Sequence, residues 1–186
     1  TEPSLNRRTL VRAGTLGFAM LGLASQSGSA ASPNVTADAI TGGGVMQAGG
    51  GPAEFSVFGA SFLTPTSDAP RFAGSLNYID VVAKTIVVSV SISAFGPVEG
   101  SESTTRQMSG IATVDAAGAH PFDVILTDGG PIGSGLDQFE LRVGADGATS
   151  TKDPIYEVQS TVQAGNLQLL TISLGDNTEA SPTPAG

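Results

Sequence analysis

The sequence contains no cysteine and a single histidine, His120. A chain without cysteine has no disulfide, no thiolate metal ligand and no cysteine nucleophile. One histidine excludes a metal site with two histidine ligands and leaves little capacity for general-base catalysis. His120 precedes Pro121 where the chain enters an expected strand, and no serine occupies the Gly-x-Ser-x-Gly elbow of hydrolases. We therefore expect an exposed turn histidine and no Ser-His-Asp triad.

Charged residues make up only 13% of the chain, and tryptophan is absent. Acidic residues outnumber basic ones by 17 to 8, and the net charge of −9 argues against nucleic-acid binding, because phosphate contacts need clustered Lys and Arg. Glycoside hydrolysis requires two carboxyl groups at a defined separation. Here the acids are numerous and no pair stands out, while most aromatic residues fall at strand positions expected to face the core. We expect a protein that is not an enzyme, with extracellular proteins or polysaccharides as its partners.

Residues 1–30 have the composition of an export signal. Arg7 and Arg8 form a pair in a basic head, residues 13–24 are apolar, and residues 25–30 are small and polar. The arginine pair followed by Thr-Leu is similar to the twin-arginine export signal, with an ordinary secretory signal as the alternative. The apolar run is shorter than the about 20 residues of a membrane-spanning helix. We expect a secreted or periplasmic protein that keeps no stable membrane anchor once the signal is removed.

The remaining chain divides into three parts. Residues 31–52 are rich in Gly, Ala, Ser and Thr and indicate a linker, whose second half can also begin a strand; residues 53–175 carry short apolar runs; residues 176–186 form a polar tail. In the middle part apolar residues alternate with period two between turns rich in Gly, Pro and Asp. This pattern predicts an all-β fold, an antiparallel β-sandwich of about eight strands, with closure into a barrel as the alternative. The expected strands are 53–63, 71–82, 85–95, 105–115, 120–127, 137–144, 154–162 and 166–174.

The order of several motifs in this chain resembles a known domain family. A Gly-x-Leu-x-Tyr-x-Asp strand occupies residues 74–80, a Gly-x-Gly-x-Asp-x-Phe segment occupies residues 133–139, and a Gly-Asn-Leu strand begins at Gly165. In this order the motifs resemble the post-COAP domain of secreted bacterial proteins, over residues 42–174. The resemblance implies a secreted β-sandwich module that accompanies other extracellular modules, and no established catalytic activity comes with it. Ala164 stands where the family would have a second glycine, which affects only the local turn.

The loop Asp128–Asp137 is the best candidate for a binding site. Its Gly-x-Gly-x-Asp segment matches the end of the nonapeptide that binds calcium in stacked repeats, but a single copy lacks the neighbouring turns that share the ion. Asp128 and Asp137, together with loop carbonyls, remain available for one calcium ion, which takes about six to eight oxygen ligands. The alternative is a glycine-rich turn whose aspartates accept backbone N–H bonds. Asp80 and Asp123 are expected at solvated strand positions, and either would complete a carboxylate cluster if it faced the loop.

Two functional hypotheses follow from these features. The first is an exported, non-enzymatic β-sandwich module for extracellular adhesion, assembly or structural support. The second is a calcium-dependent module that binds a ligand such as a carbohydrate. No cofactor other than this calcium is expected. A shallow groove with converging acids and exposed aromatic residues would favour the second hypothesis or a hydrolase, and a featureless surface would favour the first.

Overall fold

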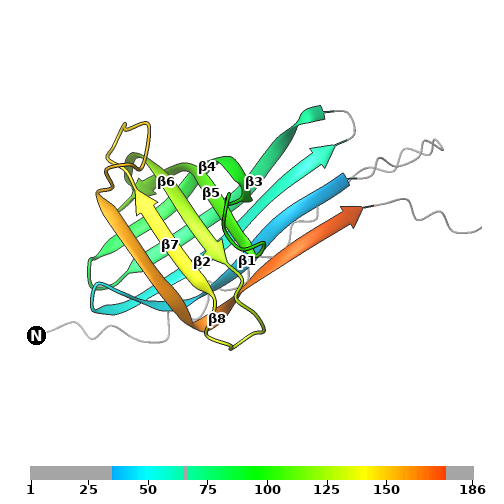
Figure 1. The fold of residues 1–186 in the computed structure, drawn as a ribbon. Helices are drawn as coiled ribbons and strands as arrows, with labels where there is room; N and C mark the ends of the chain where they lie inside the picture. Colours follow the sequence, from blue (N-terminus) through cyan, green and yellow to red (C-terminus); the bar gives the residue numbers. More distant parts are fainter. Residues whose placement is uncertain (1–34, 65–66, 175–186) are drawn as a thin grey trace, which may run out of the picture. The chain divides into compact units, whose positions relative to one another are not determined.

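The computed structural model describes residues 35–64 and 67–174, which form eight antiparallel strands joined by turns and loops (Figure 1). The strands are β1 (Val35–Ala48), β2 (Gly51–Thr64), β3 (Ser67–Asp80), β4 (Thr85–Pro97), β5 (Thr105–Val114), β6 (Ala117–Thr127), β7 (Gln138–Val143) and β8 (Tyr156–Leu174). The predicted all-β, antiparallel class is confirmed. Among these residues no helix is long and apolar enough to span a membrane. The predicted export signal, with Arg7 and Arg8, and the predicted tail at residues 176–186 lie outside the described residues.

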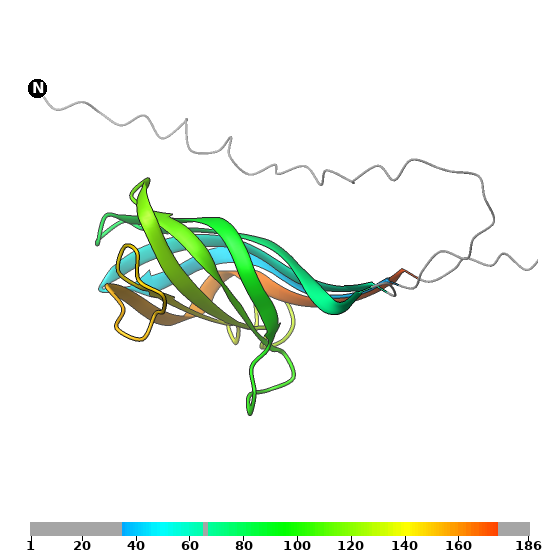
Figure 2. The same ribbon diagram turned by 90° about the horizontal axis from the view of Figure 1, so that it is seen from above.

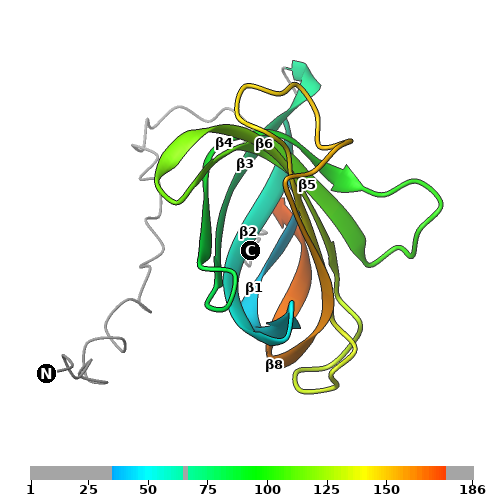
Figure 3. The same ribbon diagram turned by 90° about the vertical axis from the view of Figure 1, so that its left-hand side faces the viewer.

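Each strand pairs with the next one along the chain, and β1 also pairs with β8, so that the sheet closes into a barrel. The pairing of β1 with β8 extends from Val35↔Leu174 to Met46↔Val162. Seen along the barrel, the strands curve around a common interior (Figure 3). Closure pairs the first strand with the last and removes the two edges that an open sheet of these strands would expose. Of the two arrangements that the sequence left open, the molecule adopts the barrel.

The structure differs from the expected linker at residues 31–52, because residues 35–48 of that segment form β1. This strand lies between β2 and β8, and its side chains of Ile40 and Met46 are fully buried in the core. Small and polar residues dominate β1, so it lacks the alternating large apolar residues that mark the other strands. Its place in the sheet depends on its two neighbours more than on its own sequence.

β8 is a single strand of 19 residues where the sequence predicts two, at 154–162 and 166–174. Gly165 lies between those two segments with a φ of +118°, a conformation that L side chains rarely adopt. The register between β1 and β8 shifts at Val45/Met46, and such a bulge bends a strand pair without ending it. The expected number of strands agrees with the structure only because the missed β1 offsets the divided β8.

Glycines make the contact between β1 and β8 possible. A Cβ atom on Gly42 would lie 2.1 Å from the carbonyl oxygen of Asn166. On the facing strand, a Cβ atom on Gly165 would lie 2.1 Å from the carbonyl oxygen of Gly43. Both obstacles are backbone atoms held by the sheet, which cannot swing away as the end of a side chain does. Only glycine therefore lets the two strands approach this closely.

The barrel interior is filled by apolar and aromatic side chains from all eight strands. The ring centroid of Phe139 on β7 lies 4.5 Å from that of Phe55 on β2 and 5.8 Å from that of Tyr78 on β3. Aromatic pairs at such distances contribute about 0.5–1.5 kcal/mol beyond the area that they bury. Because β7 is not a sheet neighbour of β2 or β3, these rings connect separate walls of the barrel.

β4 changes its sheet neighbour along its length. It pairs with β3 through residues 85–88 only and with β5 through residues 87–97, with two bulges in the second pairing. β1, β2, β3 and β8 continue beyond the point where β4 leaves β3 (Figure 2). A Cβ atom on Gly59 of β2 would lie 2.6 Å from the ring of Phe95, so this ring packs on the β2 backbone. The bulges change which β4 residues face outward, and the candidate site lies beside them.

Candidate functional site

The outer surface over β4, β5 and β6 carries a groove of about 410 Å³, which is within the range of small-ligand sites, about 300–1,000 Å³. The sheet contributes Ser93 of β4, Ser109 of β5 and Asp123 of β6 to its lining. Residues 148–151, from the loop between β7 and β8, line it as well, and Ile111 adds apolar surface. Hydroxyl groups and one carboxylate therefore dominate the polar chemistry of this groove.

The carboxylate of Asp123 is held in the groove by three side chains. Its Oδ1 atom accepts hydrogen bonds from the Ser109 hydroxyl at 2.5 Å and from the Gln107 amide at 3.0 Å. Its Oδ2 atom accepts a hydrogen bond from the Thr151 hydroxyl. Both hydroxyls donate their protons to Asp123, and the Ser109 oxygen also accepts a hydrogen bond from Gln107 at 3.3 Å. The Thr151 oxygen and the remaining lone pair of the Ser109 oxygen are available to a ligand. Asp123 does face outward, as predicted, but it is half-buried and hydrogen-bonded.

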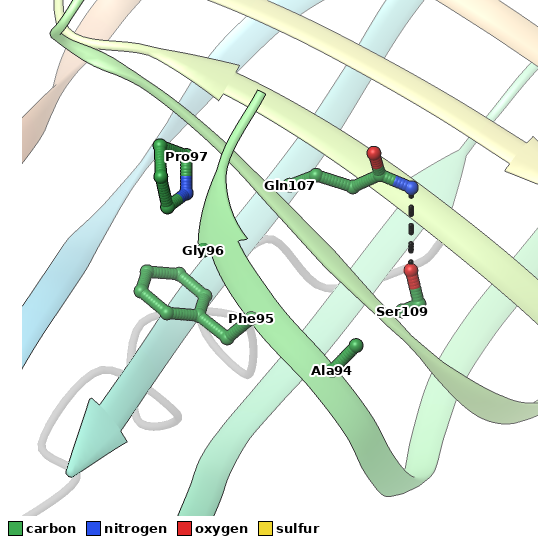
Figure 4. A pocket seen from close by; sticks show the side chains of 6 residues that line it. All are labelled: Ala94, Phe95, Gly96, Pro97, Gln107 and Ser109. Atoms are coloured by element: carbon green, nitrogen blue, oxygen red, sulfur yellow. Dashed lines mark hydrogen bonds between the residues drawn. The ribbon is translucent and has the colours of Figure 1, made fainter. Parts of the chain in front are cut away.

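A second depression, of about 300 Å³, adjoins the groove and shares Ser109 with it (Figure 4). At this depression two small residues of β4 lie beside β5: Ala94 is the register partner of Ser109, and Gly96 is the register partner of Gln107. A methyl group and a hydrogen atom occupy little of the space above the sheet, and a Cβ atom on Gly96 would have no neighbour within 4 Å. The small residues of β4 thus leave the surface of β5 uncovered.

The loop between β7 and β8 is fastened to β6, which places Thr151 at the groove. The Gly144 N–H group donates to the carbonyl oxygen of Pro121 at 2.8 Å. The Ala119 N–H group donates to the carboxylate of Asp146 at 2.7 Å. A loop that is already ordered loses less conformational entropy when a ligand binds, so this part of the site is preorganised.

Positive charge is missing from both hollows: of the described residues that line them, none is lysine, arginine or histidine. Arg142 of β7 is the register partner of Asp123, but its guanidinium group binds Glu157 at 2.8 Å and Glu140 at 3.1 Å. The partners of the Asp123 carboxylate are therefore neutral donors. Such a site suits a ligand that carries no negative charge and is rich in hydrogen-bond donors.

His120 and Asp80 differ from their predicted environments. His120 is buried on β6, where its Nδ1 atom lies 3.0 Å from the carbonyl oxygen of Gly144. Asp80 is 2% exposed at the end of β3. The turn residues beside them indicate solvent exposure, but the period-two alternation of β6 and β3 turns both side chains inward.

Asp80 belongs to a buried network that includes both tyrosines of the chain. Tyr156 OH donates to Asp80 Oδ2 at 2.7 Å and lies 2.6 Å from the hydroxyl oxygen of Tyr78, while the N–H groups of Val82 and Ala83 donate to Asp80 Oδ1. Burial alone would raise the pKa of Asp80, but the bonds from Ala83, Tyr156 and Val82 outweigh it, and the pKa is lowered. Burial raises the pKa of Tyr78 to about 12 and also raises the pKa of Tyr156. These groups satisfy one another inside the barrel.

The two aspartates of the predicted calcium loop each accept two backbone hydrogen bonds. Asp137 is 4% exposed and accepts from the N–H groups of Gly129 at 2.9 Å and Leu167 at 2.6 Å. Asp128 accepts one bond within the loop and one from the Leu169 N–H group at 2.9 Å. Both carboxylates thus accept N–H groups of β8 beyond the end of β7. This is the arrangement of the alternative hypothesis, a glycine-rich turn whose aspartates accept backbone N–H bonds. Among the described residues, no group of three or more His, Cys, Asp or Glu could hold a metal ion. The calcium site stays a prediction.

Gln107, Ser109 and Thr151 are site residues that the sequence does not single out. Serine and threonine are frequent throughout the chain, so neither residue type marks a site by itself. The one available signal is the alternation of the expected strand 105–115, which places Gln107 and Ser109 together on its polar face. That signal does not indicate which other segments meet them.

Comparison with models of protein families, with curated proteins and with solved structures finds no match to this chain. The resemblance to the post-COAP domain therefore stays a prediction. Function is inferred below from the geometry of the molecule and from its sequence.

Asp137→Ala removes the acceptor of two backbone hydrogen bonds. Hydrogen bonds to charged groups contribute about 1.5–3 kcal/mol, and we expect the free energy of unfolding to fall by about 2–4 kcal/mol. Asp146→Ala is the matched control, because that carboxylate accepts an exposed N–H group, and we expect a loss of about 1 kcal/mol. Urea unfolding followed by circular dichroism measures both variants. Equal losses would contradict the anchoring role of Asp137.

The same variant tests the predicted calcium site. A ligand that binds only the folded chain stabilises it by about 2.7 kcal/mol at a hundredfold excess over its Kd. If Asp128 and Asp137 hold calcium, millimolar calcium will raise the melting temperature of the unmodified chain and leave that of Asp137→Ala unchanged. Identical melting curves of the unmodified chain with calcium and with a chelator would overturn the calcium prediction.

The tyrosine network predicts a loss of stability in alkali. The pKa of Tyr78 is 10.0 without the fold and about 12 within it, so the network stabilises the fold fully below pH 10 and loses this contribution as the pH rises toward 12. Tyrosinate absorbance reports Tyr78 and Tyr156 alone, because the chain has two tyrosines. We expect this absorbance to rise together with the unfolding seen by circular dichroism. Ionisation of both residues at their ordinary pKa in a folded chain would contradict this prediction.

Proposed function

We propose that the chain is an exported, non-enzymatic module that attaches to extracellular material by binding hydroxyl-rich ligands, above all polysaccharides, in the groove around Asp123. The observation that carries the proposal is the Asp123 carboxylate, which three side chains fix at the surface of the barrel. Hydroxyl groups of a ligand would donate hydrogen bonds to the remaining lone pair of Asp123 Oδ2 and to the oxygens of Ser109 and Thr151.

The groove supports binding better than catalysis. Glycoside hydrolysis uses a pair of carboxyl groups, whereas Asp123 is the only carboxylate among the described residues that line the groove. Serine catalysis of the triad type uses a histidine base beside the hydroxyl, whereas the acceptor of the Ser109 hydroxyl is the Asp123 carboxylate. His120 is buried with its Nδ1 atom against the backbone, while Ser109 lies on the outer face of the sheet. One fixed carboxylate with several hydroxyls is well suited to orient a ligand.

The proposed location rests on the sequence. The export signal at residues 1–30, with Arg7 and Arg8, lies outside the described residues. An exported module meets polysaccharides at cell surfaces and in the surrounding matrix. A groove on the outer face of a barrel can receive the side of a long polymer, which an enclosed cavity cannot.

Binding to an array of neutral, anionic and amino glycans tests the proposal. We expect the unmodified chain to bind neutral glycans. Asp123→Asn keeps the size of the side chain but removes its charge, and we expect the affinity to fall about tenfold. Asp115→Asn is the control, since Asp115 accepts an exposed bond from Ile86 N–H in a different part of the barrel. The proposal fails if no glycan binds, or if Asp123→Asn binds as well as the unmodified chain.

Assembly of several copies is a second candidate function, favoured by an apolar surface on the β3–β4 hairpin. Its exposed side chains are Ile79, Val81, Val82, Ile86, Val88 and Val90. Ile79 and Ile86 are register partners, so the exposed side chains of the two strands lie side by side. The charged residues of this segment are Asp80, which is buried, and Lys84. Contiguous apolar surface of this kind marks protein–protein contacts.

Val88→Lys tests assembly through this hairpin. A charge placed between apolar surfaces remains unpaired on association, and we expect sedimentation velocity to show self-association weakened at least about tenfold. Ile132→Lys is the matched control, because Ile132 is 82% exposed in the loop between β6 and β7. Sedimentation of the unmodified chain as a monomer at every concentration would exclude assembly through this surface.

A further inference from the structure

The groove around Asp123 and the depression beside Gly96 adjoin each other on the outer surface of the sheet. The two hollows share Ser109. The Nε2 atom of Gln107 donates to Ser109 at 3.3 Å (Figure 4) and to Asp123 at 3.0 Å. One hydrogen-bonded cluster therefore serves both hollows. A ligand in the groove therefore has a second hollow beside it, within reach of the same cluster.

We propose that the ligand is a linear, neutral polysaccharide whose neighbouring sugar units occupy the two hollows. The inference rests on the proposed function and specifies the ligand class for that site. One unit lies in the groove against Asp123. The adjoining unit lies over Ala94 and Gly96, where the small residues of β4 leave the surface of the sheet open.

The two hollows are lined by different side chains, and each lining combines polar and apolar groups. The groove presents the hydroxyls of Ser93, Ser109 and Thr151 with the Asp123 carboxylate, which match the hydroxyl rim of a sugar. The neighbouring depression is lined by Gln107 and Ser109 as well as by Ala94, Gly96 and Pro97. Its Ala94 and Pro97 side chains suit the C–H groups on the face of a ring.

The charges of the site disfavour an anionic polymer. A uronate or sulfated chain would place anions beside Asp123, and none of the described residues that line the hollows is lysine or arginine. The chain as a whole carries a net charge of −9, which adds repulsion over longer distances. A neutral glycan avoids this cost and keeps all its hydroxyl donors.

Calorimetric titration with homologous neutral sugars tests the inference. The probes are the free sugar, the dimer and the hexamer of glucose, mannose and xylose, and polygalacturonate serves as the anionic polymer. We expect one series to bind, with its dimer and hexamer about tenfold tighter than the free sugar. Gly96→Phe fills the second hollow, and we expect it to lower the hexamer affinity to that of the free sugar. Gly96→Ala is the matched control and leaves most of the hollow open.

The possible outcomes separate this inference from the proposed function. Equal affinities for the free sugar and the hexamer, or normal hexamer binding by Gly96→Phe, would overturn the linear ligand while leaving glycan binding intact. Stronger binding of polygalacturonate than of every neutral probe would overturn the neutral ligand. Failure of all probes to bind would overturn the proposed function and this inference together. Circular dichroism and melting temperature show whether each variant is folded.

Discussion

The contact between β1 and β8 is the constraint on which the rest of the barrel depends. Carbonyl oxygens of each strand occupy the space where a Cβ atom of the other would stand, at Gly42 and at Gly165. Closure there turns a series of hairpins into a ring and pairs two edges that would otherwise be exposed. The ring encloses the interior in which Phe139 packs against Phe55 and Tyr78, so the aromatic core and the strand order support each other.

Carboxylates link parts of the barrel that strand pairing does not join. Asp137 accepts an N–H group of β8 beyond the end of β7, and Asp80 accepts two N–H groups of the turn after β3. Asp38 binds Arg106 at 2.7 Å and thereby links β1 to β5, which are not neighbours in the sheet. With 17 acidic and 8 basic residues, the chain has too few cations to pair every acid. Backbone N–H and hydroxyl groups take their place as the partners that make burial of a carboxylate tolerable.

Asp123, at the surface, is likewise hydrogen-bonded by neutral donors and not by a cation. Its donors are side chains of β5 and of the β7–β8 loop, so the cluster also joins that loop to the sheet. The difference from Asp80 and Asp137 lies in what surrounds the carboxylate. Ala94 and Gly96 leave open space beside its donors Ser109 and Gln107, whereas the interior carboxylates are enclosed. A hydrogen-bonded carboxylate, which elsewhere stabilises the fold, thus presents hydrogen-bond acceptors to a ligand at this site.

The sequence by itself determined the strands with strong alternation, such as 105–115, and with them the all-β class, because period two places apolar side chains on one face of a strand. It did not determine β1, whose small residues form a strand only between β2 and β8, or the closure into a barrel. The site was likewise decided by the tertiary structure, since Ser109, Asp123 and Thr151 belong to three separate segments. The alternation of apolar and polar residues indicates which face of a strand is buried. Which segments meet on the other face is determined only by the register of the folded sheet.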